Sequence, residues 1–215
     1  KDTVTTSTQY SYIYGIDVYE CNDINIHNNT VRMNADASGG QVGGNGTGAA
    51  YCVQLTGPHT GVVVSDNTLV TKNHGPNLGI YSQNYNGATN ITVRGNTIDV
   101  TGNAGSDEWS LVSGMELQDT YATVTGNTIT VTNSGGYSGS KCVYGISYSQ
   151  ATAGTHTFII TNNTVNVATG KYAVYLKSAV NSNISYNYLQ ARSYHRNGAV
   201  HIVSGSNNTV SGNTP

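Results

Sequence analysis

The sequence predicts an all-β solenoid in which about seven coils, each of three short strands, stack into a tube. Two observations carry this prediction. A phrase of asparagine, threonine and an aliphatic residue recurs along the 215 residues, and short runs of alternating apolar and polar residues precede each copy. One such coil buries too little apolar surface to be stable alone, so the coils have to stack. We expect residues 1–215 to form a single domain.

Each copy of the phrase is anchored on one asparagine, as in TGNTITVT at 125–132. We expect these side chains to occupy equivalent corners of successive coils. The chain turns sharply there, and asparagine tolerates left-handed backbone angles. Stacked amides can also hydrogen-bond to one another and to the neighbouring backbone, as in asparagine ladders. The predicted structural turn residues are Asn29, Asn67, Asn96, Asn127, Asn163, Asn187 and Asn213. A weaker copy of the phrase begins at Asp2.

Three strands per coil follow from the aliphatic positions around each anchor, because strand side chains alternate between two faces. The first strand is the run that begins each coil, and its inward series is Ile16, Val53, Ile80, Met115, Ile146, Val174 and Val200. The second strand ends just before the anchor and contributes Ile26, Val64, Val93, Val124, Ile160, Ile184 and Val210. The third strand follows the anchor and contributes Val31, Leu69, Ile98, Ile129, Val165 and Leu189.

The anchors are not glycosylation signals as a group. The acceptor motif needs serine or threonine two positions after asparagine, and Asn67, Asn96, Asn127 and Asn163 have an aliphatic residue there. True acceptor motifs occur at Asn28, Asn45, Asn90, Asn162, Asn183 and Asn207. Modification at those sites would need a host that performs it.

Composition excludes several classes of function. Only 9% of the residues are charged and the net charge is −2, so the chain lacks the basic surface that nucleic-acid binding requires. No apolar run approaches the ~18 residues of a membrane span, and we expect no membrane contact by this segment. Three cysteines without zinc-site spacing predict buried free thiols, no metal site and no cofactor.

The repeat carries a family resemblance over essentially the whole chain. The pattern G-[IMV]-x-[VIL] followed by [IVF]-x-[IV]-x-x-N-T-[VIL] resembles the right-handed parallel β-helix of the pectate-lyase-like superfamily. That superfamily includes polysaccharide lyases, glycoside hydrolases, phage tailspikes and surface adhesins. The asparagine-, threonine- and tyrosine-rich, charge-poor composition is similar to that of adhesin-like surface proteins of archaeal methanogens.

In the enzymes of that superfamily, substrate usually lies on the outer face of the first strand. A strip of small residues, Gly15 to Ala199, precedes this face and suggests a shallow groove for a sugar chain. Tyrosine, present sixteen times, suits contact with sugars through its flat apolar ring and its hydroxyl. The predicted ligand-binding residues are Asp17, Gln54, Tyr81, Glu116, Gln118, Tyr175, Lys177 and His201.

Catalytic chemistry has few candidates in this sequence. Glycoside hydrolysis needs two carboxyl groups about 5 to 9.5 Å apart, whereas Asp17 and Glu116 are predicted three coils apart, about 14 Å. Asp107 and Glu108 lie in a loop that can fold over Glu116. A basic loop with Arg192, His195 and Arg196 leads to His201. Glu116 and His201 are therefore the catalytic candidates, with no firm assignment.

We expect an extracellular or cell-surface domain for adhesion or carbohydrate binding, with a polysaccharide or cell-surface glycan as partner. The alternatives are a polysaccharide lyase or glycoside hydrolase working on the first-strand face, and a structural spacer without ligand. Glycine-, serine- and asparagine-rich insertions at 34–49, 101–112 and 132–141 suggest a variable wall beside that face. Because the repeat begins and ends within copies, we expect neighbouring domains in a longer parent chain.

Overall fold

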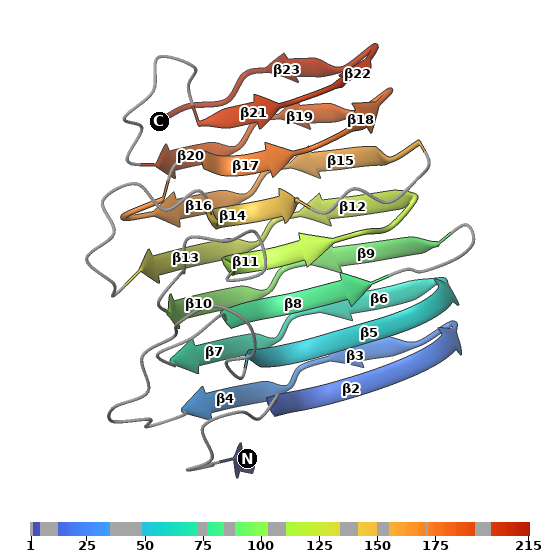
Figure 1. Cartoon of the computed structure of the whole chain (residues 1–215), viewed down its shortest axis with the longest axis vertical. Coiled ribbons are helices and arrows are strands. Elements are labelled where there is room, and N and C mark those ends of the chain that lie inside the picture. The colour runs from blue at the N-terminus through green and yellow to red at the C-terminus, as the bar shows by residue number, and fades with distance from the viewer. Residues whose placement is uncertain are drawn as a thin grey trace.

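The computed structural model shows coils stacked along one axis, with the N-terminus at one end of the tube and the C-terminus at the other (Figure 1). It describes residues 2–4, 13–34, 49–72, 77–83, 89–102, 111–133, 142–149, 155–170, 172–191 and 199–215. Three long sheets of seven strands run the length of the tube, and every strand pair among these residues is parallel. The chain is therefore a parallel β-helix, as the repeat predicts.

Each coil gives one strand to each sheet. The first sheet contains β2 (Ile13–Asn22), β5 (Ala50–Thr60), β8 (Asn77–Gln83), β11 (Val112–Leu117), β14 (Val143–Tyr148), β17 (Tyr172–Leu176) and β21 (Val200–Ile202). The second contains β3 (Asn25–His27), β6 (Val62–Ser65), β9 (Asn90–Arg94), β12 (Tyr121–Thr125), β15 (Thr157–Thr161), β19 (Asn183–Ser185) and β23 (Thr209–Ser211). The third contains β1 (Asp2–Val4), β4 (Thr30–Asn34), β7 (Thr68–Lys72), β10 (Thr97–Gly102), β13 (Thr128–Asn133), β16 (Thr164–Val167) and β20 (Tyr188–Ala191). A short extra pair joins β18 (Ala179–Val180) to β22 (Gly205–Ser206).

The interior of the tube is a stack of aliphatic columns, one for each predicted series. From Val53 to Val174 every member of the first series is fully buried, and Ile16 and Val200 at the two ends are half-buried. The second series is buried from Ile26 to Ile184, whereas Val210 in the last coil is 50% exposed. Burying a Val, Leu or Ile side chain contributes about 1.5–3 kcal/mol, so these columns are the main source of stability.

The seven anchor asparagines form a continuous ladder, as the sequence predicts. In each step the backbone N–H and the side-chain Nδ2 of one asparagine donate to the Oδ1 of the next, at 2.9–3.1 Å. From Asn67 onward each Nδ2 also donates to a second-sheet carbonyl of the coil before, such as that of Val93 for Asn127. The ladder thus satisfies buried polar groups that water cannot reach.

The left-handed residue of each corner is not the anchor, and this part of the prediction is wrong. The residue immediately before the anchor takes a positive φ, between 57° and 66°. These residues are Asn28, Asp66, Gly95, Gly126, Asn162, Tyr186 and Gly212. The physical reason is that the anchor's N–H and side-chain amide have to point along the tube axis to bond to the next anchor. The residue before the anchor therefore adopts the left-handed backbone conformation that makes the turn.

The strip of small residues in the first sheet faces inward, which corrects the predicted groove. A Cβ on Gly114 would overlap the Ile129 side chain of the third sheet and the Gly145 carbonyl of the next coil. Gly15, Gly79 and Gly145 meet equivalent obstacles. Of the other members, Cys52 and Ala173 are fully buried and Ala199 in the last coil is half-buried. Small residues are needed here because the first and third sheets approach closely, so this strip lines the interior of the tube and not an outer groove.

The weak copy of the phrase at Asp2 joins the third sheet in a shifted register. β1 pairs with β4, but Asp2 is opposite Val31 and Val4 is opposite Met33. The aligned phrase would have placed Asp2 opposite Asn29. A shift of two residues preserves the period-two alternation between paired strands, which is why the alternating pattern alone did not reveal it.

The ladder makes a direct prediction for stability. Asn127→Ala removes the acceptor of the Asn96 N–H and amide together with the donor to Asn163 and Val93. We expect the free energy of unfolding to fall by about 2–4 kcal/mol, because each buried group left without a partner costs about 1–3 kcal/mol. Chemical denaturation measures this change.

The matched control is Asn166→Ala, the same substitution at a half-buried position of β16 that makes no side-chain hydrogen bond within the described residues. We expect it to cost less than about 1 kcal/mol. Equal losses in the two variants would show that the ladder adds nothing beyond an ordinary surface asparagine.

Candidate functional site

The predicted ligand-binding column exists as a column in the first sheet. Strand register places Asp17, Gln54, Tyr81, Glu116, Ser147, Tyr175 and His201 beside one another in successive coils. Exposure divides it into parts. Asp17 is exposed, Gln54, Tyr175 and His201 are half-buried, and Tyr81, Glu116 and Ser147 are buried. Of the two neighbouring candidates, Gln118 is buried and Lys177 is half-buried.

Glu116 is held inside the structure at the centre of this face. Its Oε2 accepts a hydrogen bond from the Ser147 hydroxyl at 2.6 Å, and its Oε1 accepts from the Ser149 N–H at 2.7 Å. The carboxyl group is 0% exposed. The neighbouring outward side chains form a second apolar cluster that contains Leu78, Tyr81, Leu111, Cys142, Tyr144 and Tyr172. In this conformation a polymeric substrate has no path to the Glu116 carboxyl group.

The accessible aromatic part of the column lies at its C-terminal end, whereas Asp17 and Gln54 are the accessible residues at its other end. Tyr172 and His201 stack with ring centroids 4.6 Å apart and planes 8° apart, and Tyr175 lies 5.8 Å from His201. Tyr144 continues the stack, 4.6 Å from Tyr175. Stacking of this kind fixes the rings, so the half-buried Tyr175 and His201 present a rigid edge to solvent. Lys177, also half-buried, follows Leu176 at the end of β17.

A buried polar network occupies the corner between the first and second sheets. His59 Nε2 lies 2.6 Å from Asp119 Oδ1, and both side chains are at most 1% exposed. His59 Nδ1 lies 2.9 Å from the Gly57 carbonyl oxygen. Because that oxygen only accepts, Nδ1 carries a proton. A second histidine also contacts Asp119. His156 Nδ1 lies 2.9 Å from the backbone oxygen of Asp119, and His156 Nε2 lies 3.0 Å from the Tyr148 hydroxyl.

This network resembles a Ser-His-Asp triad in composition but not in geometry. Ser82 Oγ lies 3.3 Å from His59 Nε2, the same nitrogen that contacts Asp119. A triad places the serine and the carboxylate on opposite ring nitrogens. Ser82 is also fully buried. The network therefore links coils and does not present a nucleophile.

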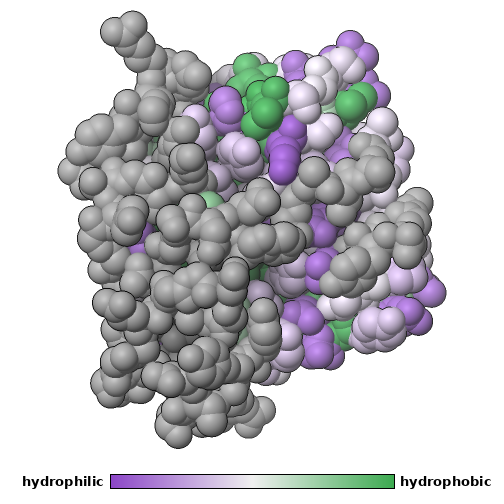
Figure 2. All heavy atoms as spheres, viewed as in Figure 1, coloured by the Kyte–Doolittle hydropathy of each residue, from purple (hydrophilic) through white to green (hydrophobic). Residues whose placement is uncertain are grey.

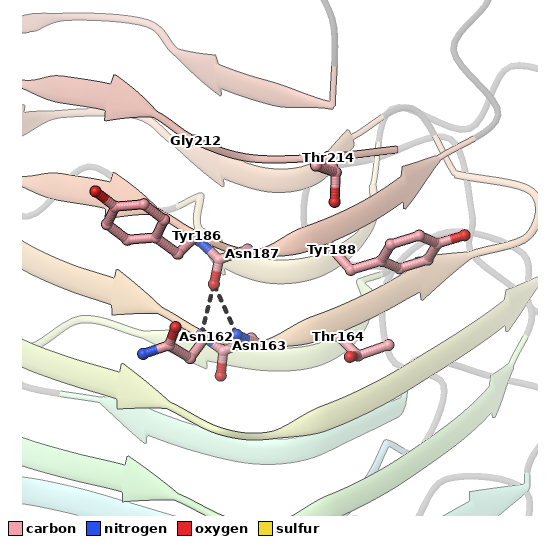
Figure 3. A pocket seen from close by; sticks show the side chains of 8 residues that line it. All are labelled: Asn162, Asn163, Thr164, Tyr186, Asn187, Tyr188, Gly212 and Thr214. Carbon is pink, nitrogen blue, oxygen red and sulfur yellow. Dashed lines mark hydrogen bonds between the residues drawn. The ribbon is translucent and has the colours of Figure 1, made fainter.

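A second exposed aromatic pair lies at the asparagine corner near the C-terminal end. Tyr186 is 70% and Tyr188 is 44% exposed, and they flank a hollow of about 440 Å³. Figure 3 shows the two rings pointing to opposite sides of Asn187, whose amide joins the ladder. The hollow is lined by Asn162, Asn163, Thr164, Tyr186, Asn187, Tyr188, Gly212 and Thr214.

The sequence prediction missed this hollow because it treated SYNYLQA at 185–191 as one more copy of the phrase. The sequence does carry a signal for this hollow, namely the two residues in which SYNYLQA differs from the other copies of the phrase. Other corners place glycine, asparagine or aspartate before the anchor, and most place threonine after it, whereas this corner places tyrosine at both positions.

Other predicted features are resolved only in part. Asp107, Glu108, Arg192, His195 and Arg196 lie outside the described residues, as does most of the three predicted insertions. All three cysteines are free thiols, and burial raises the pKa of Cys52 to about 12. Within the described ranges, no three His, Cys, Asp or Glu side chains gather to hold a metal ion. Nor does this part of the chain contain a helix long and apolar enough to cross a membrane.

His59 gives a testable dependence of stability on pH. Burial lowers its pKa, but the hydrogen bond and negative charge of Asp119 and the Gly57 carbonyl outweigh burial, and the net pKa is raised above the ordinary 6.5. The folded state therefore binds the proton more tightly than the unfolded state. The stabilisation is complete below about pH 6.5 and is lost as pH rises through the folded pKa.

We expect the free energy of unfolding to fall as the pH rises above about 6.5, by at most about 1.4 kcal/mol per pH unit. Asp119→Asn should flatten this slope, because it removes the charge that raises the His59 pKa. His27→Gln is the control, since His27 is exposed and contacts only the adjacent Asn28 side chain. Urea titrations at several pH values measure the slope. An unchanged slope in Asp119→Asn would contradict the assignment.

No protein-family model, curated protein or solved structure matches this chain. The fold is assigned from the parallel pairing of its strands, and the function has to be argued from the side chains that the fold presents.

Proposed function

We propose that this chain is an adhesin-like, carbohydrate-binding β-helix of an extracellular or cell-surface protein. The observation that carries the proposal is the exposed end of the aromatic stack on the first sheet, where Tyr175 and His201 stand in register on adjacent coils. The resemblance of the repeat to the pectate-lyase-like superfamily, and of the composition to archaeal adhesin-like proteins, supports the same class. The proposed partner is a polysaccharide or a cell-surface glycan.

The chemistry of this edge suits a sugar chain. A pyranose ring has an apolar face and a rim of hydroxyl groups, and it is recognised by a flat ring together with a few placed polar groups. Tyr175 offers a ring and a phenol, His201 offers ring nitrogens, and Lys177 offers a cation. Because Tyr172 and Tyr144 hold these rings from behind, little side-chain freedom is lost on binding.

The surface as a whole fits a display scaffold. Figure 2 shows a described surface that is mostly hydrophilic, with a hydrophobic patch toward the C-terminal end of the tube. Only 9% of the residues are charged, so the hydrophilic character comes mainly from asparagine, threonine, serine and tyrosine. Such a surface offers hydrogen bonds without a strong field, which suits uncharged or weakly charged ligands.

The test measures binding and turnover together. We expect the protein to bind at least one polysaccharide on a glycan array, and Tyr175→Ala and His201→Ala each to raise the Kd at least about fivefold. Tyr121→Ala is the control, because Tyr121 is 58% exposed on β12 of the second sheet. Thermal melting confirms that each variant is folded.

The other outcomes separate the alternatives. Release of reducing or unsaturated ends, lost in Glu116→Gln or His201→Ala, would establish a hydrolase or lyase instead. If the protein neither binds nor cleaves any glycan on a broad array, the structural spacer is the remaining alternative.

A further inference from the structure

The corner around Asn187 departs from every other corner of the tube. Six of the seven residues before the anchors are glycine, asparagine or aspartate, the residues that tolerate a positive φ. The seventh is Tyr186, at φ 57°. A bulky residue in this conformation is an outlier and destabilises the backbone locally. Such strain persists at functional sites when the side chain has a use.

The second departure lies directly beside the first. Strand register aligns Tyr188 with Thr164 on the preceding coil and with Thr214 on the following coil. The threonines keep the hollow open on both sides of Tyr188. Gly212 does the same beside Tyr186, because a Cβ there would lie 2.9 Å from the Tyr186 ring. The two tyrosines are thus accommodated by small neighbours and remain exposed.

We propose that this hollow binds a sugar residue of a neutral glycan, at a site separate from the first sheet. This inference rests on the proposed function for the class of ligand, a glycan, but it places the binding site at a different position. The lining residues include no charged side chain and no aliphatic one, so the hollow offers no side-chain charge to pair with an ionic ligand and no aliphatic wall to surround an apolar one. It offers two ring faces and a set of neutral hydrogen-bonding groups, which is the complement of a pyranose.

The hydrogen-bonding groups of the hollow are available to a ligand. The amides of Asn163 and Asn187 are used by the ladder. In contrast, the side chains of Asn162, Thr164, Tyr186, Tyr188 and Thr214 make no hydrogen bond within the described part of the chain. The ladder holds the backbone of this corner, so Tyr186 and Tyr188 extend from fixed positions on either side of Asn187.

The sugar in this hollow can belong either to a glycan attached to the protein or to a free glycan. Asn162 is exposed and stands two residues before Thr164, which makes it a glycosylation acceptor motif. A glycan attached there would lie beside Tyr186, whereas a free glycan would arrive from solution. Protein from a host without N-glycosylation can bind only free glycan. Thr164→Val in a glycosylating host prevents attachment of a glycan to Asn162.

The test uses the whole chain from a host without N-glycosylation, titrated by calorimetry with gluco-, manno-, xylo- and chito-oligosaccharides of four to six units. We expect Tyr186→Asn and Tyr188→Thr, which restore the residue types of the other corners, each to raise the Kd for a bound oligosaccharide at least about fivefold. Tyr186→Asn should also raise the melting temperature, because it relieves the backbone strain. Tyr121→Ala should leave the Kd unchanged.

Each result decides between the two sites. Loss of binding in Tyr186→Asn and Tyr188→Thr, with Tyr175→Ala unaffected, supports the corner site alone. Loss only in Tyr175→Ala overturns the corner site and keeps the first-sheet proposal. If the unglycosylated protein binds none of these sugars, the site for free glycan is overturned. A drop in melting temperature when Thr164→Val removes an Asn162 glycan would then identify the attached sugar as the occupant.

Discussion

The asparagine ladder is the interaction on which the rest of this structure depends. Each step places two donors of one coil on a single oxygen of the next, so neighbouring corners have to be superimposed in position and orientation. That requirement fixes the register of the second and third sheets, whose aliphatic residues keep a constant spacing to the anchor, and a coil shifted there by one residue would put its aliphatic side chains outside the tube. The columns of Val, Ile and Leu supply most of the stability, and the ladder determines that they meet.

The same constraint explains which positions vary along the chain. The residue before each anchor bears the turn and is restricted to types that accept a left-handed backbone, while the anchor itself does not vary. A departure at such a corner costs stability and has no structural benefit. Tyr186 is therefore more informative than any of the other exposed tyrosines, such as Tyr19 or Tyr121, which lie on strands where tyrosine is an ordinary choice.

Some outward-facing side chains of the tube are buried and others are exposed to solvent. The middle of the first sheet carries a second apolar cluster and the enclosed Glu116, and the corner after it contains the His59–Asp119 pair. The His59–Asp119 contact connects two coils that are not adjacent, since β8 lies between β5 and β11 in the first sheet, whereas Glu116 binds Ser147 of the next coil. These polar contacts stabilise the scaffold, and they leave the two ends of the first sheet and the Asn187 corner as accessible polar-aromatic surfaces.

The sequence by itself determined the architecture, because spacing around Asn127 and its equivalents encodes both the strand period and the ladder. Inward columns such as Val53 to Val174 followed directly from alternation. The tertiary structure alone decided three matters. It showed that Gly114 faces inward, that the residue before each anchor makes the turn, and that Glu116 is enclosed while Tyr186 is exposed. Alternation gave the wrong face for Gly114, where only the approach of Ile129 from the third sheet shows that the residue points inward. For Glu116 and Tyr186, exposure depends on side chains from other coils, which the sequence of a single strand does not specify.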